Sequence, residues 1–389
     1  MTTRSQAVVD PRAVSTAEAP RSARYFVNPL VDFILIGGGS MAVYVLFRLQ
    51  PHMASSPAVL SLAATLVWYC NYPHFAATNL RLYGRKDNLR QYPITAVSVP
   101  LIMIGTAVAC YASPTQVAPM LVHLYLIWSP YHFSGQTIGI ALLYARRAGF
   151  DVTKWERRAL MSVVFLTFIT QNARAEVAHY KANFYSVSYP TLGIPSWVPH
   201  VCTAAMFVSV GALGGLLMWR ALDKRQIVPF MMLVPVAAQW IWFVGLPVNH
   251  VTGNYNALVP FFHSLQYLVI AWALNLRESM TLRKATPSGR YVLSESARWA
   301  VVIGILGWVL FWGVPHLGAH FGKPLAFSTA IMLAVIQLHH FFVDGVIWKL
   351  RNPNVRSPLS TTLGELTGHR PSPDAPAPAP VAVAAAAVG

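Results

Sequence analysis

The chain alternates long apolar runs with short polar connections that are rich in lysine and arginine. An α-helix needs roughly 20 apolar residues to cross a bilayer, and about ten runs approach or exceed that length. They lie at about 30–49, 57–80, 93–112, 117–145, 157–173, 197–219, 227–246, 257–276, 298–315 and 325–348. This pattern predicts an all-α fold: a polytopic transmembrane helix bundle of about ten helices.

The composition supports a membrane protein, since 55% of the 389 residues are hydrophobic and only 11% are charged. Soluble domains carry roughly a quarter charged residues. A net charge of +16 is also found in nucleic-acid-binding proteins, but most of the 29 lysines and arginines lie in alternate connections and in the two terminal arms. That asymmetry is typical of the positive-inside rule and predicts both termini in the cytoplasm. Membrane lipids are therefore the expected partners, and nucleic acid is not.

The polar positions divide the chain into three parts. Residues 1–24 are predicted to be a disordered basic arm, and residues 25–352 the transmembrane helical domain. Residues 353–389 are predicted to be a cytoplasmic tail, which is Pro/Ala-rich from about residue 371 and too poor in large apolar groups to pack there.

Histidines within the apolar runs are the candidate chemistry. Ionisable side chains at membrane depth are costly and usually face the interior of a bundle. They come from four separate runs, which is what a bundle needs to close a metal site from facing helices. The five residues are His74, His132, His263, His339 and His340. Adjacent residues of a helix point about 100° apart, so only one of the last two is expected to face a given centre. His263 is expected to be the shallowest and therefore the weakest member.

Polar and aromatic residues accompany these histidines. Amides and a carboxylate lie three or four positions away, where they project from the same helix face and could orient a ligand ring: Asn71, Gln136, Gln266 and Asp344. Aromatic neighbours predict an apolar substrate pocket beside the polar chemistry, formed by Tyr72, Phe75, Tyr131, Phe133, Phe262, Tyr267 and Phe341. Imidazole nitrogen suits Fe(II), zinc and copper alike, so the residues alone leave the metal open.

The segments NYPHF, YHFSGQ, FFHSLQY and HHFFVDG resemble polytopic bacterial membrane proteins of the Brp/Blh type, the β-carotene-cleaving dioxygenases. The resemblance implies an all-helical protein of the bacterial inner membrane, with one non-haem Fe(II) held by histidines from several helices. It also implies O2-dependent chemistry on a carotenoid- or lipid-like substrate. The four-histidine centre carries over to His74, His132, His263 and one of His339 and His340.

We therefore interpret the chain as a membrane-embedded non-haem iron oxygenase, an oxidoreductase that takes a lipophilic small molecule from the bilayer. Two alternatives stay open at this point. One is a transporter or lipid-handling membrane protein with functional histidines. The other is a haem-binding electron-transfer protein that uses paired histidines as axial ligands. The sequence names no electron donor.

Overall fold

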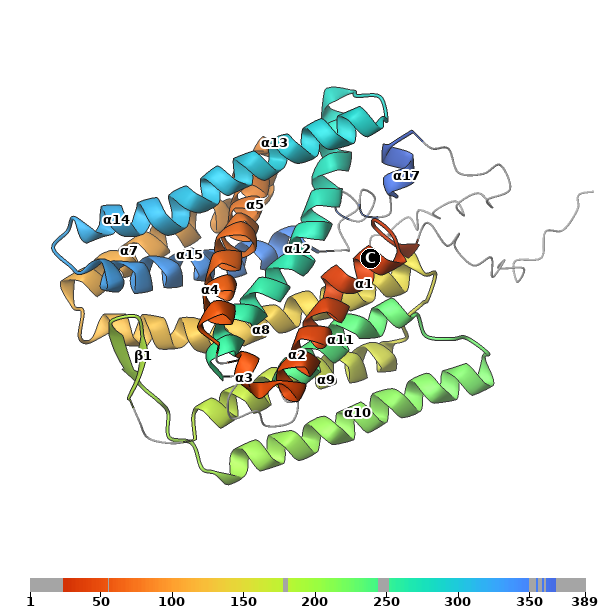
Figure 1. The fold of residues 1–389 in the computed structure, drawn as a ribbon, viewed down its shortest axis with the longest axis horizontal. Coiled ribbons are helices and arrows are strands. Elements are labelled where there is room, and N and C mark those ends of the chain that lie inside the picture. Colours follow the sequence, from red (N-terminus) through yellow and green to blue (C-terminus); the bar gives the residue numbers. More distant parts are fainter. Residues whose placement is uncertain are drawn as a thin grey trace, which may run out of the picture.

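The computed structural model describes residues 24–54, 56–177, 181–243, 252–349, 355, 359 and 362–368, and these residues are helical almost throughout (Figure 1). In chain order, with η marking a π-helical turn, the elements are α1 (Pro29–Phe33), η2 (Ile34–Gly38), α2 (Gly39–Leu49), α3 (Pro51–Ala54), α4 (Pro57–Leu66), η3 (Val67–Asn71), α5 (Tyr72–Tyr83), α6 (Lys86–Gln91), η4 (Ile94–Ser98), α7 (Val99–Ala112), α8 (Val117–Arg147), α9 (Lys154–Ala175), β1 (Lys181–Phe184), β2 (Val187–Pro190), α10 (Trp197–Asp223), α11 (Phe230–Phe243), α12 (Thr252–Arg283), α13 (Gly289–Trp308), η5 (Val309–Gly313), α14 (Val314–Ala319), α15 (Leu325–Ile347) and α17 (Leu363–Leu366). The predicted all-α helical bundle is confirmed. Residues 1–23 of the predicted arm and 369–389 of the predicted tail lie outside the described residues.

Several helical stretches of the described chain are long and apolar enough to cross a membrane, which fits a multi-pass membrane protein. These six are Pro29–Leu49, Ile94–Ala112, Trp197–Asp223, Leu258–Arg283, Gly289–Ala319 and Leu325–Ile347. The count of about ten spanning helices and the cytoplasmic position of both termini stay predictions.

The spanning stretches differ in how deeply they are packed. Within the most apolar part of each stretch, 67% of the residues are buried in Leu258–Arg283 and 61% in Leu325–Ile347, compared with 17% in Trp197–Asp223. Figure 1 shows α10 along one edge of the molecule and α13 with α14 along the opposite edge, with α8, α12 and α15 between them. The interior of the bundle is thus supplied by α12 and α15, while α10 exposes apolar residues as a lipid-facing helix does.

Proline shapes three of the π-helical turns. Pro73, Pro100 and Pro315 each stand two positions after the end of such a turn, in the first turn of the following helix. Proline has no N–H group, and its ring collides with the carbonyl four residues earlier, so a helix widens locally to pass it. At Pro73 this widening comes directly before His74 and sets where α5 begins.

A glycine in α13 lets this helix approach the same point. A Cβ atom at Gly307 would lie 2.8 Å from the carbonyl carbon of Tyr72 and 3.0 Å from the nitrogen of Pro73. Only a residue without a side chain allows two backbones to come so close. The backbone before His74 therefore rests directly on α13.

The end of the bundle where α8 finishes is tied together by buried polar groups. Asp32 accepts hydrogen bonds from the backbone N–H groups of Phe26 (2.7 Å) and Val27 (3.0 Å) and from the Tyr144 hydroxyl (2.8 Å). Arg147 donates to the Tyr25 carbonyl (2.6 Å) and to the carbonyl of Leu359. Both ends of the described chain are thereby fixed to α8.

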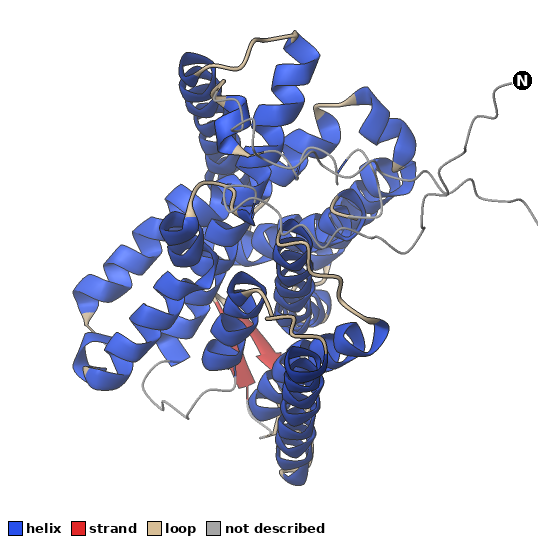
Figure 2. Ribbon diagram, turned by 90° about the vertical axis from the view of Figure 1, so that its right-hand side faces the viewer, coloured by secondary structure: helices blue, strands red, loops and turns tan. Residues whose placement is uncertain are grey.

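The connection at about 174–196 contains the antiparallel hairpin of β1 and β2 (Figure 2). Its aromatic side chains cover the first half of α8: Phe184 contacts Tyr125, with ring centroids 5.5 Å apart, and Tyr189 contacts His123 at 5.2 Å. Glu176 accepts hydrogen bonds from His123 Nε2 (2.9 Å) and from the Leu192 N–H group (2.7 Å). The hairpin thus packs over the first half of α8.

Candidate metal centre

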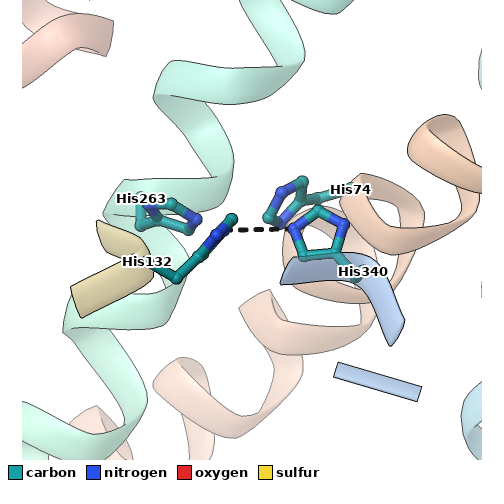
Figure 3. Close-up of side chains that lie close together, drawn as sticks. All are labelled: His74, His132, His263 and His340. Carbon is teal, nitrogen blue, oxygen red and sulfur yellow. Dashed lines mark hydrogen bonds between the residues drawn. The ribbon is translucent and has the colours of Figure 1, made fainter. Parts of the chain in front are cut away.

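Four of the five predicted histidines meet at one point inside the bundle. One ring nitrogen from each of His74, His132, His263 and His340 lies within 4.8 Å of the corresponding atom of every other. The residues come from α5, α8, α12 and α15, and their rings point toward one another (Figure 3). All four side chains are buried. Residues at least 58 positions apart in the sequence thus contribute one imidazole each.

The spacing of the rings suits one shared ion. His132 Nε2 and His340 Nε2 are 3.2 Å apart. Two nitrogens bound to the same ion at about 2.0–2.1 Å are separated by about 3 Å when the ligand angle is near 90–110°. The neighbouring ring centroids around the cluster are 4.5–5.1 Å apart. The cluster therefore fits a mononuclear site after small movements of the rings.

Several nitrogens of these rings have no hydrogen-bond partner among the described residues. They are Nε2 of His74, Nε2 of His263 and Nδ1 of His340. A buried polar atom left without a partner costs about 1–3 kcal/mol. A cation between the rings would satisfy the two unpaired Nε2 atoms together with the close pair formed by His132 and His340. The donor set fits a metal ion for this reason.

The His74 ring is oriented by a relay from the neighbouring helix. Its Nδ1 lies 3.0 Å from the Ser264 hydroxyl, which donates to Asn71 Oδ1 at 2.7 Å. When Ser264 donates to Asn71, its oxygen accepts from Nδ1–H, and Nε2 of His74 is left as the electron-pair donor. Such contacts fix the tautomer of a ligand histidine. Asn71 thus acts on His74 through Ser264, which the sequence did not single out.

Asp344 is the carboxylate at the edge of the cluster. Its Oδ2 lies 3.2 Å from His340 Nε2 and 3.8 Å from His132 Nε2. The i, i+4 spacing on α15 predicted the first of these contacts. Asp344 therefore faces two of the four imidazoles and adds negative charge on one side of the site.

The other oxygen of this carboxylate is held in place by three donors. Oδ1 accepts hydrogen bonds from the Thr78 hydroxyl (3.1 Å), the Tyr267 hydroxyl (3.4 Å) and the Trp348 indole N–H (3.1 Å). Thr78 and Tyr267 also contact each other through their hydroxyl groups. Because Oδ1 is occupied, Oδ2 is the oxygen available to the histidines.

The two glutamines predicted to orient ligand rings have other partners. Gln136 Nε2 donates to the backbone carbonyl of His263 (2.8 Å) and to Gln266 Oε1 (3.3 Å). Gln266 Nε2 donates to the Ile36 carbonyl at 2.5 Å. Both amides reach across to neighbouring helices, so their role in orienting the ligand rings stays a prediction. They position the backbone of α12.

The adjacent histidines of α15 separate as their helical spacing predicts. His340 points into the cluster, whereas His339 Nε2 lies 3.1 Å from the Tyr83 hydroxyl, outside the group of four. His263, which the sequence marked as the shallowest member, lies fully within the group. The depth of His263 was predicted by counting residues from the ends of the apolar run at 257–276. Because α12 extends beyond this run at both ends, that count does not give the depth of the residue reliably.

A pocket of about 310 Å³ adjoins the cluster. His132 and Asp344 lie in its wall, together with Tyr131, Tyr267 and Phe341 of the predicted pocket residues. Trp348, which the sequence analysis did not include, is a further wall residue. A largely aromatic cavity with a few polar groups at one end is the usual form of a ligand site.

The remaining predicted pocket residues lie elsewhere. Phe133 and Phe262 line a separate small cavity of about 40 Å³, which also contacts His263. Tyr72 stacks on Phe311, with ring centroids 4.4 Å apart. Phe75 packs against the rings of His74 (4.8 Å) and His340 (4.6 Å), and neither it nor Tyr72 lines the larger pocket.

Some residues of the site carried signals in the sequence that were not used. Ser264 directly follows His263, and Trp348 stands four positions after Asp344, one turn along the same helix face. Thr78 stands four positions after His74. A hydroxyl or indole donor one turn beyond a histidine or a buried carboxylate points to Thr78 and Trp348, whereas the contact of Ser264 with His74 of another helix has no such signal.

No protein-family model, curated protein or solved structure matches this chain, so its function is argued from the site itself.

Proposed function

We propose that this protein is a membrane-embedded non-haem iron oxygenase that acts with O2 on a lipophilic substrate. The single observation that carries the proposal is the convergence of four buried imidazoles from four helices on one point, with ring nitrogens that lack other partners. Structural histidines in membrane helices commonly satisfy themselves by hydrogen bonds to a neighbouring helix. Here the nitrogens face one another instead.

The donor set is compatible with iron, the metal that the proposed chemistry requires. Four neutral nitrogens with a carboxylate at the edge form a nitrogen- and oxygen-rich site, and the cluster contains no cysteine among the described residues. Such ligands suit Fe(II), and they also accept zinc and copper. When bound, iron would supply the ability to activate O2. The role of the chain is to hold the four rings, to orient them through Ser264 and Asp344, and to keep bulk water away.

The pocket supports a lipophilic substrate. Its wall consists mainly of aromatic and aliphatic side chains and glycines, and it reaches the centre at His132 and Asp344. One side of the four-histidine cluster is therefore open to a molecule held in an apolar cavity. A substrate there would approach between these two residues.

The geometry argues against the haem alternative. Axial histidines bind on opposite faces of a haem, and the macrocycle fills the plane between them. If His132 and His263 were the axial pair, the other two imidazoles would stand about 5 Å from it, since His340 is 4.8 Å from His132 and His74 is 5.1 Å from His263 between ring centroids. The space that a porphyrin requires is occupied by these rings.

The test is elemental analysis of purified protein from cells grown with ample iron, combined with O2 consumption in the presence of membrane lipid extracts. We expect close to one iron per chain and an optical spectrum without a Soret band. Protein that carries no bound metal, yet still retains lipids through purification, would favour the lipid-handling alternative. Stoichiometric zinc without O2 consumption would contradict an oxygenase.

Asp344 is expected to strengthen metal binding through the rings that it contacts. Replacing it by asparagine keeps an acceptor for Thr78 and Trp348 but removes the negative charge beside His340. Groups that contact metal ligands typically contribute 10–100-fold in affinity. We therefore expect Asp344→Asn to weaken iron binding by about 10–100-fold in a competition titration with a chelator.

The control for this variant is Asp87→Asn, because Asp87 is exposed on α6 and does not belong to the cluster. The control should bind iron as the unaltered protein does. An affinity of Asp344→Asn within twofold of the unaltered protein would show that this carboxylate has no part in the centre.

A further inference from the structure

The pocket beside the centre arises because two helices that pack closely over one half separate over the other. Between Leu121 and Tyr125, α8 packs against residues of α15 from Ile331 to Phe341 in a continuous apolar core. Further along, from Tyr131 on α8 and from Phe341 on α15, the pocket lies between them. The helices thus form a wedge that opens away from the hairpin.

Glycines keep the wedge open. Gly135 and Gly139 stand one turn apart on α8, and Gly345 faces the pocket from α15. At each of the three, an added Cβ atom would find no other atom within 4 Å. These glycines are therefore not required for close helix packing, and their lack of side chains creates a groove instead.

The groove has an open side at membrane depth. Gly135 and Gly345 are exposed, as is Tyr131, whose exposed fraction is 48%. Gly345 lies in Leu325–Ile347, one of the six stretches that could span a membrane, and Tyr131 and Gly135 lie on α8 within the apolar run predicted at about 117–145. Because their neighbours in a bilayer would be acyl chains, a ligand can enter sideways between α8 and α15.

The two ends of the groove differ in chemistry. His132 and Asp344 stand at one end, beside the metal centre. Lys349 stands five residues after Asp344, just beyond the end of α15, and also lines the pocket. It is exposed, and no carboxylate pairs with it in the part of the chain that the structure describes. From His132 to Leu143, which also lines the pocket, α8 rises about 16 Å at 1.5 Å per residue. Between these polar groups the groove is lined mainly by aromatic and aliphatic side chains and glycines, with Gln136 among them, and Lys349 is its cationic residue.

We propose that this groove binds a long-chain amphiphile with an anionic head group. The head lies at Lys349, the chain passes Gly139 and Gly135, and the part of the chain distant from the head reaches His132 and Asp344. The argument is charge complementarity at one end and an apolar, side-chain-free floor along the rest. The inference rests on the proposed function for its catalytic meaning, because it names the substrate class of that centre, but the binding itself needs no metal.

The test is photolabelling of the full chain in lipid nanodiscs. The probes are a long-chain fatty acid with a diazirine at its terminal carbon, the same acid with the diazirine next to the carboxylate, and the matching terminal-diazirine alcohol. Peptide mass spectrometry then locates the label. We expect the terminal diazirine to label the segment from Tyr131 to Gly139, and the head-proximal diazirine to label residues next to Lys349.

Charge reversal at the mouth separates specific binding from partition into the bilayer. Lys349→Glu removes an attraction and adds a repulsion, so labelling by the acid should fall about tenfold, while labelling by the alcohol stays unchanged. Lys349→Arg should retain labelling by the acid. Lys224→Glu is the matched control, since Lys224 is an exposed lysine just beyond α10 that lines neither pocket. Equal labelling by acid and alcohol, with no response to Lys349→Glu, would overturn the proposal.

A side chain placed in the groove should block it. Gly139→Leu is expected to abolish labelling by the terminal diazirine, whereas Gly211→Leu on lipid-facing α10, where a Cβ also meets no atom within 4 Å, should not. An anionic phospholipid with a diazirine-bearing chain identifies the source: its labelling assigns the groove to a membrane lipid, and labelling by the fatty acid alone assigns it to the free acid.

The failure of this inference can be told apart from failure of the proposed function. The labelling is repeated after metal removal by a chelator. Labelling of the groove in protein that never binds iron would sustain the amphiphile site and reject the oxygenase. Bound iron without specific labelling would reject the amphiphile site alone.

Discussion

Replacing His340 by alanine is expected to remove the metal ion from the protein, whereas replacing the adjacent His339 should leave the ion bound. His340 belongs to the four-ring cluster and is fully buried, while His339 contacts the Tyr83 hydroxyl outside it. Losing one of four ligands should weaken metal affinity by more than about a hundredfold, beyond the 10–100-fold typical of groups that only contact ligands. O2 consumption should fall by a similar factor.

The two substitutions form a matched pair, since they alter neighbouring residues of one helix by the same chemistry. Metal content by elemental analysis is the first readout, and elution as a monodisperse species in detergent shows that each variant is folded. Thermal unfolding with and without added iron gives the second readout, because a ligand that binds only the folded state raises its stability. Iron should stabilise the His339→Ala variant and leave the His340→Ala variant unchanged. Equal metal content in both variants would contradict the four-histidine centre.

Replacing Arg220 by methionine is expected to lower the free energy of unfolding by about 3–5 kcal/mol, the usual cost of leaving one charge of a buried pair alone. Arg220 Nη1 donates to Glu156 Oε2 (2.7 Å) and to the Asp151 carbonyl (2.6 Å), and the guanidinium lies 4.0 Å over the Phe150 ring. Gln226 Oε1 accepts from the same guanidinium at 2.7 and 2.9 Å. This network joins α9 to α10.

The measurement is denaturant unfolding in mixed micelles, with Lys224→Met as the control because Lys224 is exposed in the same turn region. The control should change stability by no more than about 0.5 kcal/mol. The double variant Arg220→Met with Glu156→Met should be more stable than Arg220→Met alone, since no unpaired carboxylate then remains. A single variant as stable as its control would show that the pair contributes nothing to the fold.

The sequence predicted the helices and the cluster for the same physical reason: a polar side chain inside an apolar run must find a partner within the bundle. This reasoning identified His74, His132, His263 and the pair His339 and His340 without any contact information. The helical angle of about 100° per residue also predicted that only one of the pair would face the centre, although it did not say which. The burial of polar residues within apolar runs could therefore be predicted from each helix alone.

The contacts that depend on two helices could not be predicted in this way. Asn71 stands three positions before His74, but the π-helical turn that ends at Asn71 breaks the regular 3.6-residue spacing, and Ser264 of α12 bridges the two. Gln136 and Gln266 share a helix face with their histidines, yet their amides donate to backbone carbonyls of neighbouring helical segments, those of His263 and Ile36. Which partner a long polar side chain selects is decided by helix packing, and a pattern along one segment contains no information about it.

The contact of Gly307 with the backbone of Tyr72 and Pro73 connects the centre to a helix that contributes no ligand. Only 22% of the residues in the most apolar part of Gly289–Ala319 are buried, so in a bilayer most of this stretch would face the lipid. The tilt of such a helix responds to the thickness of the surrounding bilayer. A change in that tilt would therefore be expected to move the backbone at Tyr72 and Pro73, directly before His74, and so to couple the centre to the thickness of the bilayer.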